Sequence, residues 1–187
     1  MCVSSFSFLF CASEERAKPD EYNFDHPNAF DWTAAKEVLQ SFKQGLGARV
    51  PSYSFNDHRR LDEATVVPPG VELVLFEGIM ALTQEEVRDV LDLKIFVDTD
   101  ADICLARRVK RDVVERGRTV EDVIAQYLKY VKPGNNEFVL PSKDFSDLII
   151  PFGANPRSVD VLVNYLEKHL FLNEEERKKN RASRGLM

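Results

Sequence analysis

Residues 94–118, KIFVDTDADICLARRVKRDVVERGR, decide the fold class because they join a strand signal directly to a helix signal. The apolar run LKIFV is short and almost continuous, which is typical of a strand buried on both faces. Asp100 is a candidate N-cap for a helix from about Ala101 to Glu115, and Gly117 lies where that helix should end. A buried strand that leads straight into a helix is the repeating unit of α/β domains.

The same alternation continues on both sides of this stretch. Residues 71–79, VELVLFEGI, are apolar, too short for a typical helix and preceded by Pro-Pro-Gly, so they predict a central parallel strand. Residues 147–151, DLIIP, predict a third buried strand. The chain is therefore expected to form an α/β domain with a mostly parallel sheet flanked by helices.

Helix signals separate these strands. Asp31 is a candidate N-cap for a helix to about Lys43, with Gly45 beyond its end. One face of that helix is apolar and carries Trp32, Ala35, Val38, Leu39 and Phe42. Three further helices have start signals: a capping box from Thr83 to Glu86, Thr119 before Val120–Tyr130, and Pro156 before a helix to about Leu170.

Two short β-rich runs form an excursion from this pattern. Residues 50–55, VPSYSF, and 63–67, EATVV, are separated by the charged segment NDHRRLD. This arrangement predicts a hairpin, and binding residues often lie on such protrusions.

Composition limits the classes of protein to consider. With 187 residues, 44% of them hydrophobic, the chain can bury one core and is expected to be one domain. Its 25 basic and 31 acidic residues give a net charge of −6 and a pI near 5.2, which argues against nucleic acid and membrane partners. Its three scattered cysteines suit a reducing compartment, so we expect a cytoplasmic protein.

The first twelve residues, MCVSSFSFLFCA, are apolar but contain no Lys or Arg, and they are too short to span a bilayer. Phe6, Phe8 and Phe10 alternate with other residues at a period of two. This alternation favours a buried strand over a targeting signal.

A dense group of cations carries the strongest chemical signal: Arg107, Arg108, Lys110, Arg111, Arg116 and Arg118. Guanidinium groups bind phosphate through paired hydrogen bonds and stabilise the charge that develops during phosphoryl transfer. The alternative is a solvated helix face whose arginines pair with Asp112 and Glu115. Spacing alone leaves both interpretations open.

Two weaker signals accompany this group. Glu77 ends the predicted strand 71–79, where a carboxylate can hold Mg²⁺ or simply face solvent. Residues 23–31, NFDHPNAFD, with Tyr53, Phe55 and His58, offer aromatic rings and polar groups that can bind a base and a sugar, or can be structural.

Taken together, these segments resemble uridine/cytidine kinases. The resemblance rests on NFDHPNAFD, VPSYSF with His58, LVLFEGI, residues 94–118, QYLKYVKP and DLIIPFGA, in the family's order and at similar spacing. It extends from about residue 21 to about residue 170. It implies a P-loop kinase fold with a β-hairpin and an Arg-rich lid, and transfer of the γ-phosphate of ATP, with Mg²⁺, to the 5′-hydroxyl of uridine or cytidine.

The resemblance also implies roles for individual residues. Asp25 and Arg108 would bind the ribose hydroxyls, and Glu77 would serve the magnesium site. The base would be recognised by Tyr53, His58, Arg118 and Gln126, beside Phe24 and Phe55. Arg111 and Arg116 would face the phosphates, and Asn155 would lie near the adenine, at a position where relatives can carry Asp.

The sequence departs from the family's pattern near its N-terminus. None of its eight glycines precedes Lys, so it contains no GxxxxGK[ST] loop, and no Asp or Glu that could act as general base occurs before Glu14. We therefore expect the first strand, the P-loop, the first helix and the catalytic base to be missing from these residues. The expected divisions are an atypical segment 1–20, a partial kinase-like domain 21–171 and a charged tail 172–187.

Two interpretations of this departure remain. The sequence can be an incomplete version of an active pyrimidine-salvage kinase, or a non-catalytic paralogue that binds nucleoside or regulates full-length subunits. Either one predicts uridine or cytidine as ligand and weak ATP binding at most. Because the family is commonly oligomeric, a homo-oligomer or an association with full-length kinase also stays open. A general anion-binding module would account for the arginines alone.

Overall fold

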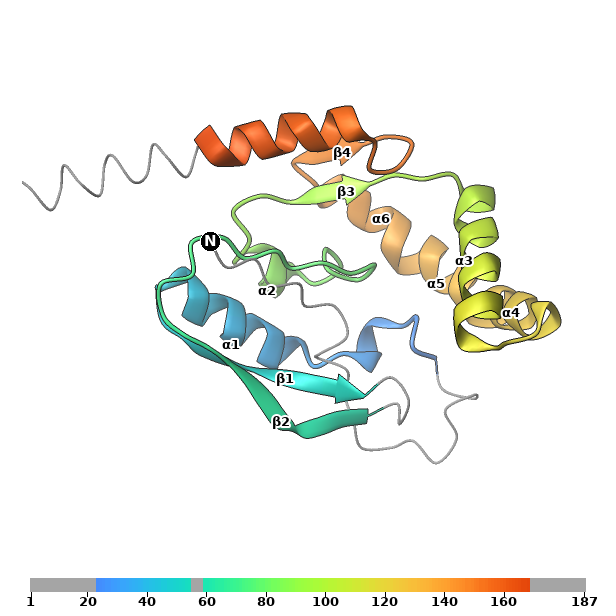
Figure 1. Ribbon diagram of the computed structural model, residues 1–187, viewed down its shortest axis with the longest axis horizontal. Coiled ribbons are helices and arrows are strands. Elements are labelled where there is room, and N and C mark those ends of the chain that lie inside the picture. Colours follow the sequence, from blue (N-terminus) through green and yellow to red (C-terminus); the bar gives the residue numbers. More distant parts are fainter. Residues whose placement is uncertain (1–22, 55–58, 169–187) are drawn as a thin grey trace, which may run out of the picture. The chain divides into compact units, whose positions relative to one another are not determined.

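A computed structural model describes residues 23–54 and 59–168. These residues form helices and two separate two-stranded sheets, so the predicted α/β class is confirmed at this coarse level (Figure 1). Contacts divide the chain into two units. Among the described residues, the first contains those from 23 to Phe96 together with Asp100–Ile149, and the second contains Val97–Thr99 and those from Ile150 to 168. The predicted segments 1–20 and 172–187 lie outside the described residues.

Helix α1 (Trp32–Lys43) forms as its sequence predicts. The carboxylate of Asp31 accepts a hydrogen bond from the backbone N–H of Ala34 at 3.0 Å, which caps the helix. Its apolar face is buried at Ala35, Val38, Leu39 and Phe42, whereas Trp32 is half-buried. Gly45 adopts a φ of 74° just beyond the helix, as a terminating glycine does.

The predicted hairpin is confirmed. Strands β1 (Ala48–Ser54) and β2 (Arg59–Val67) pair antiparallel, with an irregularity between Pro51 and Tyr53. Val50 and Val67 pack against α1 in the main core cluster, so the hairpin and the helix stabilise each other (Figure 1).

The predicted central strand at 71–79 is wrong for the described structure. This segment is extended, but only Leu75 makes an isolated bridge, and the side chains of Leu75 and Ile79 are 51% and 56% exposed. A central strand requires hydrogen-bonding neighbours along both edges, and the described residues supply none beyond that bridge. The predicted mostly parallel sheet is therefore not present in this part of the chain.

The other two predicted strands form and pair with each other. Strand β3 (Ile95–Val97) lies beside β4 (Leu148–Ile150). The backbone N–H of Leu148 donates to Lys94, and that of Asp98 donates to Ile150, so the bonded residues advance together along both strands. This is the order of a parallel pair.

Helix α3 (Ala101–Arg116) follows β3 and ends at Gly117, which has a left-handed φ of 63°. Both features confirm the prediction, although the side chain of Asp100 makes no capping hydrogen bond. Helix α2 (Glu85–Arg88) also lacks its predicted cap, because the hydroxyl of Thr83 donates to the carbonyl of Met80 instead. Helix α4 (Val120–Gln126) does begin at Thr119, whose hydroxyl accepts from the N–H of Asp122 at 3.1 Å.

The predicted helix end at Tyr130 is wrong, because helical backbone continues to residue 145. Two π-helical turns, Tyr127–Val131 and Asn135–Val139, alternate with α5 (Lys132–Gly134) and α6 (Leu140–Ser142), and a 3₁₀ turn follows at Lys143–Phe145. Each wide turn precedes a proline, Pro133 or Pro141. A wider turn relieves the clash of the proline ring with the preceding turn, so the helix passes through both prolines.

In the second unit, a helix begins at Pro156 as predicted and is described to residue 168. Among the described residues, no helix is both long and apolar enough to cross a membrane.

Candidate functional site

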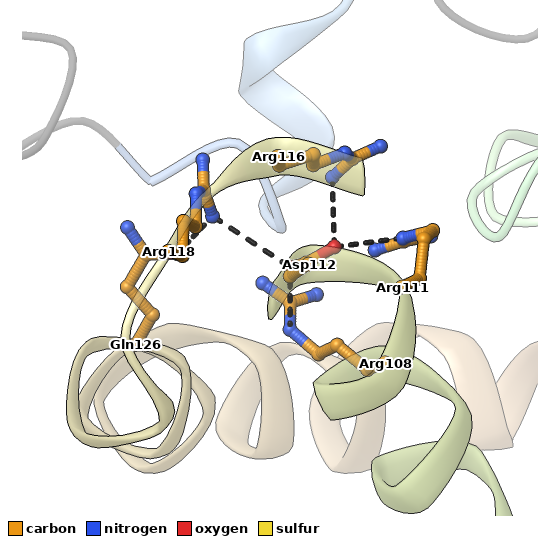
Figure 2. A network of polar contacts seen from close by, with 6 residues as sticks. All are labelled: Arg108, Arg111, Asp112, Arg116, Arg118 and Gln126. Carbon is orange, nitrogen blue, oxygen red and sulfur yellow. Dashed lines mark hydrogen bonds and ion pairs between the residues drawn. The ribbon is translucent and has the colours of Figure 1, made fainter. Parts of the chain in front are cut away.

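The carboxylate of Asp112 lies at the centre of the arginine group. Asp112 is on α3, its side chain is fully buried, and four arginines surround it (Figure 2). Two of them contact Oδ1: Arg111 through Nε at 2.7 Å and Arg116 through Nη1 at 3.2 Å. The other two lie 3.7 Å from Oδ2: Arg108 through Nε and Arg118 through Nη1.

Local sequence explains this convergence. Arg108 and Arg116 are four residues before and after Asp112, so an α-helix places all three on one face. Gly117 then reverses the chain, and the backbone N–H of Arg118 donates to the carbonyl oxygen of Asp112 at 3.1 Å. The left-handed turn thus returns a fourth guanidinium to the same carboxylate.

The group formed by Asp112 and its four arginines carries more positive than negative charge. Four guanidinium groups share one carboxylate, which leaves a net positive charge, and the side chains of Arg111 and Arg116 are 43% and 46% exposed. Burial alone would raise the pKa of Asp112, but the hydrogen bond from Arg111 and the charges of Arg111, Arg116 and Arg108 outweigh it and lower that pKa. Asp112 is therefore ionised at neutral pH, and the exposed guanidinium groups keep N–H donors for an anion.

Helix α4 contributes an uncharged hydrogen-bond acceptor to the arginine group. The side-chain carbonyl of Gln126 accepts a hydrogen bond from Nη1 of Arg118 at 2.8 Å. Arg118 thus contacts both Asp112 and Gln126, so two of the four residues that were predicted to recognise the base lie together (Figure 2).

Asp25 lies in a turn that packs against α5, in the helical backbone that continues from α4. Its backbone carbonyl lies against Gly134, where a Cβ atom would collide with it. Burial raises the pKa of Asp25, and the positive charge of Arg108 opposes that rise. Burial likewise lowers the pKa of Arg108, while Asp112 and Asp25 counteract it. The structure therefore brings Asp25 within electrostatic reach of Arg108, the pair that was predicted to bind ribose.

The turn continues into a 3₁₀ helix, Pro27–Ala29, and its His26 ring packs edge to face on Phe138 with centroids 4.8 Å apart. A hollow of about 330 Å³ lies beside it, lined in part by His26, Asn28 and Phe138. None of the predicted site residues that the structure describes lines this hollow. Phe24, which precedes Asp25, is half-buried.

The remaining predicted site residues are not gathered in this way. Phe55 and His58 lie outside the described residues, and Tyr53 is placed only as a backbone position in β1. Glu77 is exposed, and within the described ranges no three His, Cys, Asp or Glu side chains are grouped to hold a metal. Asn155, in the second unit, accepts a hydrogen bond from the N–H of Ser158 at 3.0 Å and so begins the last helix.

Sequence reasoning treated Asp112 only as a charge partner for a solvated face, and it overlooked Gly134. Asp112 had a usable signal, since it is the acid spaced four residues from two arginines. Gly134 had none, because the residue it contacts is more than a hundred positions away in the sequence.

Comparison with known proteins finds relatives that match most of this chain. A family model described as the phosphoribulokinase / uridine kinase family matches residues 3–157. Uridine-cytidine kinase B of Dictyostelium discoideum is 43% identical over 179 residues, which are 95% of this chain and 73% of that protein. Uridine kinase-like protein 5 of Arabidopsis thaliana is 40% identical over 170 residues, which are 90% of this chain and only 36% of that protein.

A solved structure supports the fold. Phosphoribulokinase from Rhodobacter spheroides superposes with a TM-score of 0.61 at 17% identity, over 80% of this chain and 60% of that one. At that level of identity the likeness concerns the fold alone.

Proposed function

The chain belongs to the phosphoribulokinase / uridine kinase family, and we propose that it carries the nucleoside-facing and phosphate-facing arginines of a pyrimidine-nucleoside kinase. The reaction of such a kinase is transfer of the γ-phosphate of ATP to the 5′-hydroxyl of uridine or cytidine. The single observation that carries this proposal is the convergence of four arginines on the buried carboxylate of Asp112, with Asp25 close to Arg108.

This geometry suits the sugar and the base. The ionised carboxylate of Asp25 accepts hydrogen bonds from ribose hydroxyls, while Arg108 donates to the same hydroxyls. Arg118, held by Gln126, presents a guanidinium edge to the pyrimidine. Phe24, Tyr53, Phe55 and His58 complete the base contacts in this proposal.

The geometry also suits phosphate. Arg111 and Arg116 are anchored through one N–H each and remain partly exposed, so their other donors can bind phosphate oxygens in pairs. In a loose phosphoryl-transfer transition state, negative charge spreads over the equatorial oxygens, and guanidinium groups stabilise it. ATP, when bound with Mg²⁺, supplies the phosphoryl group.

Among the residues proposed for the site, only one carboxylate is available to Mg²⁺. Glu77 is one exposed carboxylate, and Mg²⁺ in kinases is commonly held by one or two carboxylates with phosphate oxygens and water. Glu77 would therefore be a single protein ligand of Mg²⁺. Asn155, which caps the last helix, would lie near the adenine. A protein of these 187 residues alone lacks a GxxxxGK[ST] loop and an early general base, so we propose that it binds nucleoside without turnover.

The proposal is tested by calorimetric titration of the chain with uridine, cytidine and 2′-deoxyuridine, followed by a coupled assay for ADP release. We expect uridine and cytidine to bind, 2′-deoxyuridine to bind at least about tenfold more weakly, and no multiple turnovers to occur. Absence of binding to all three nucleosides contradicts the nucleoside site. Repeated turnover contradicts the inactivity of these residues.

The cellular setting follows from the same expectations. We propose a reducing compartment such as the cytoplasm, where the exposed thiol of Cys104 stays reduced. Association with itself or with full-length kinase subunits is a further proposal, which size-exclusion chromatography of the two chains alone and mixed would test.

A further inference from the structure

One buried carboxylate links arginines to which two different tasks are assigned above. Oδ1 of Asp112 holds Arg111 and Arg116, the phosphate-facing pair, at 2.7 and 3.2 Å. Oδ2 faces Arg108 and Arg118, the nucleoside-facing pair, at 3.7 Å each. Because the side chain of Asp112 is fully buried, it acts on a ligand only through these arginines.

We infer that Asp112 is a positioning residue that couples the phosphate-facing pair of arginines to the nucleoside-facing pair. This inference rests on the proposed function. Four like charges within one cluster repel each other, and a central carboxylate both offsets that repulsion and fixes where each guanidinium points. Removing its charge would raise the positive charge of the cluster while it releases the arginines from their common anchor.

The contacts of Asp112 Oδ2 provide a route by which nucleoside binding can change phosphate binding. Arg108 Nε and Asp112 Oδ2 are buried, and within the described part of the chain neither has a hydrogen-bond partner. Their separation of 3.7 Å is longer than a hydrogen bond of about 2.9 Å. A ribose held by Asp25 and Arg108 can turn the guanidinium and close this gap. The carboxylate is rigid and planar, so any rotation also moves Oδ1 and the phosphate-facing pair.

The test compares two variants with the same change in net charge. Asp112→Asn and Glu115→Gln each remove one negative charge from α3, but Glu115 is exposed and outside the network. The probe is inorganic pyrophosphate, titrated into the 187-residue chain by calorimetry. We expect Asp112→Asn to weaken pyrophosphate binding by about tenfold or more, although attraction by net charge alone predicts stronger binding. Glu115→Gln should stay within about twofold of the unchanged chain.

Coupling is measured by repeating each titration with saturating uridine. In the unchanged chain, uridine should strengthen pyrophosphate binding by about fivefold or more, and in Asp112→Asn that factor should approach one. Equal pyrophosphate affinity and equal coupling in the unchanged chain and Asp112→Asn would overturn the inference alone. Failure of the unchanged chain to bind either ligand would overturn the proposed function, and this inference with it.

If Asp112→Asn does not fold, the unchanged chain still tests the inference by NMR of its arginine Nε–H groups. Arg111→Lys and Arg108→Lys assign the two signals. We expect the Nε–H signal of Arg111 to lie at the chemical shift of a hydrogen-bonded proton without ligand, and that of Arg108 to move to such a shift only when uridine binds. An Arg108 signal that uridine leaves unchanged would overturn the coupling.

Discussion

At the scale of single residues, Asp25 allows the effect of a carboxylate on stability to be measured separately from its proposed role in binding. Burial raises its pKa, so the folded state holds the proton of Asp25 more tightly than the unfolded state does. The contribution of Asp25 to stability therefore falls as pH rises from the ordinary value of 3.8 through the raised folded pKa. Ionisation of this carboxylate therefore costs folding free energy, which suits its proposed role in binding ribose.

Asp25→Asn should therefore leave the melting temperature equal or higher while uridine binding falls by about tenfold or more, since a charge-assisted hydrogen bond contributes about 1.5–3 kcal/mol. The preference for uridine over 2′-deoxyuridine should shrink as well. Thermal melts and calorimetric titrations check both, with Asp62→Asn on the exposed face of β2 as the control. A variant that keeps the full preference for ribose would remove Asp25 from the sugar site.

The pKa of Asp112 is shifted in the opposite direction to that of Asp25. Its pKa is lowered in the folded state, so its stabilising contribution is present above the ordinary value of 3.8 and is lost as pH falls through the lower folded pKa. Asp112→Asn should be less stable than the unchanged chain by about 1–3 kcal/mol at pH near 7, and this gap should narrow in strong acid. Urea denaturation at neutral and acidic pH measures the gap. A gap independent of pH would mean that the carboxylate is not ionised among its arginines.

At the scale of elements, the turn that ends α3 positions Arg118, which is proposed to contact the base. Gly117→Ala forces a side chain into the left-handed region at φ 63°, which costs about 1–2 kcal/mol although a Cβ there meets no neighbour. Gly45→Ala, beyond α1, meets the same strain at φ 74° with equally open space. Both variants should melt at similarly lower temperatures, but only Gly117→Ala should weaken uridine binding, because Arg118 follows that turn. Equal uridine affinities in the two variants would show that the turn at Gly117 does not position a residue that binds uridine.

Helix starts offer a second paired comparison. Thr119 caps α4 through its side chain, whereas Asp100 makes no side-chain cap for α3. Thr119→Ala should therefore destabilise the protein by about 0.5–2 kcal/mol, and Asp100→Ala should change stability by a few tenths of a kcal/mol. Chemical denaturation of both variants checks this ranking. The reverse ranking would contradict the cap assignments.

At the scale of the whole molecule, the described residues leave many apolar side chains in solvent. Leu75 and Ile79 in the extended segment and Val97 in β3 are each about half exposed, and Phe152 is 83% exposed. Open strand edges with apolar side chains promote association. We expect the 187-residue protein to bind a hydrophobic dye and to scatter light increasingly with concentration. A sharp, concentration-independent melt of a monomer would contradict this expectation.

Local sequence determined the elements whose signals lie within a few residues of each other. These are α1 with its Asp31 cap, the β1–β2 hairpin, and α3 with its ending at Gly117. It also determined which arginines lie around Asp112, because helical spacing brings Arg108 and Arg116 to the same face as that residue. Such features depend on backbone propensity and caps, which neighbouring residues settle.

Only the tertiary structure decided the rest. Residues 71–79 have the composition of a buried strand but remain unpaired in the described structure, because strand formation requires a partner that the segment cannot supply itself. The helix after α4 passes through Pro133 because wide turns accommodate the ring. The full burial of the Asp112 side chain is likewise tertiary, although helical spacing and the turn at Gly117 already bring its four arginines together. Sequence spacing places charges on a face, but packing determines whether water or an arginine satisfies each carboxylate oxygen.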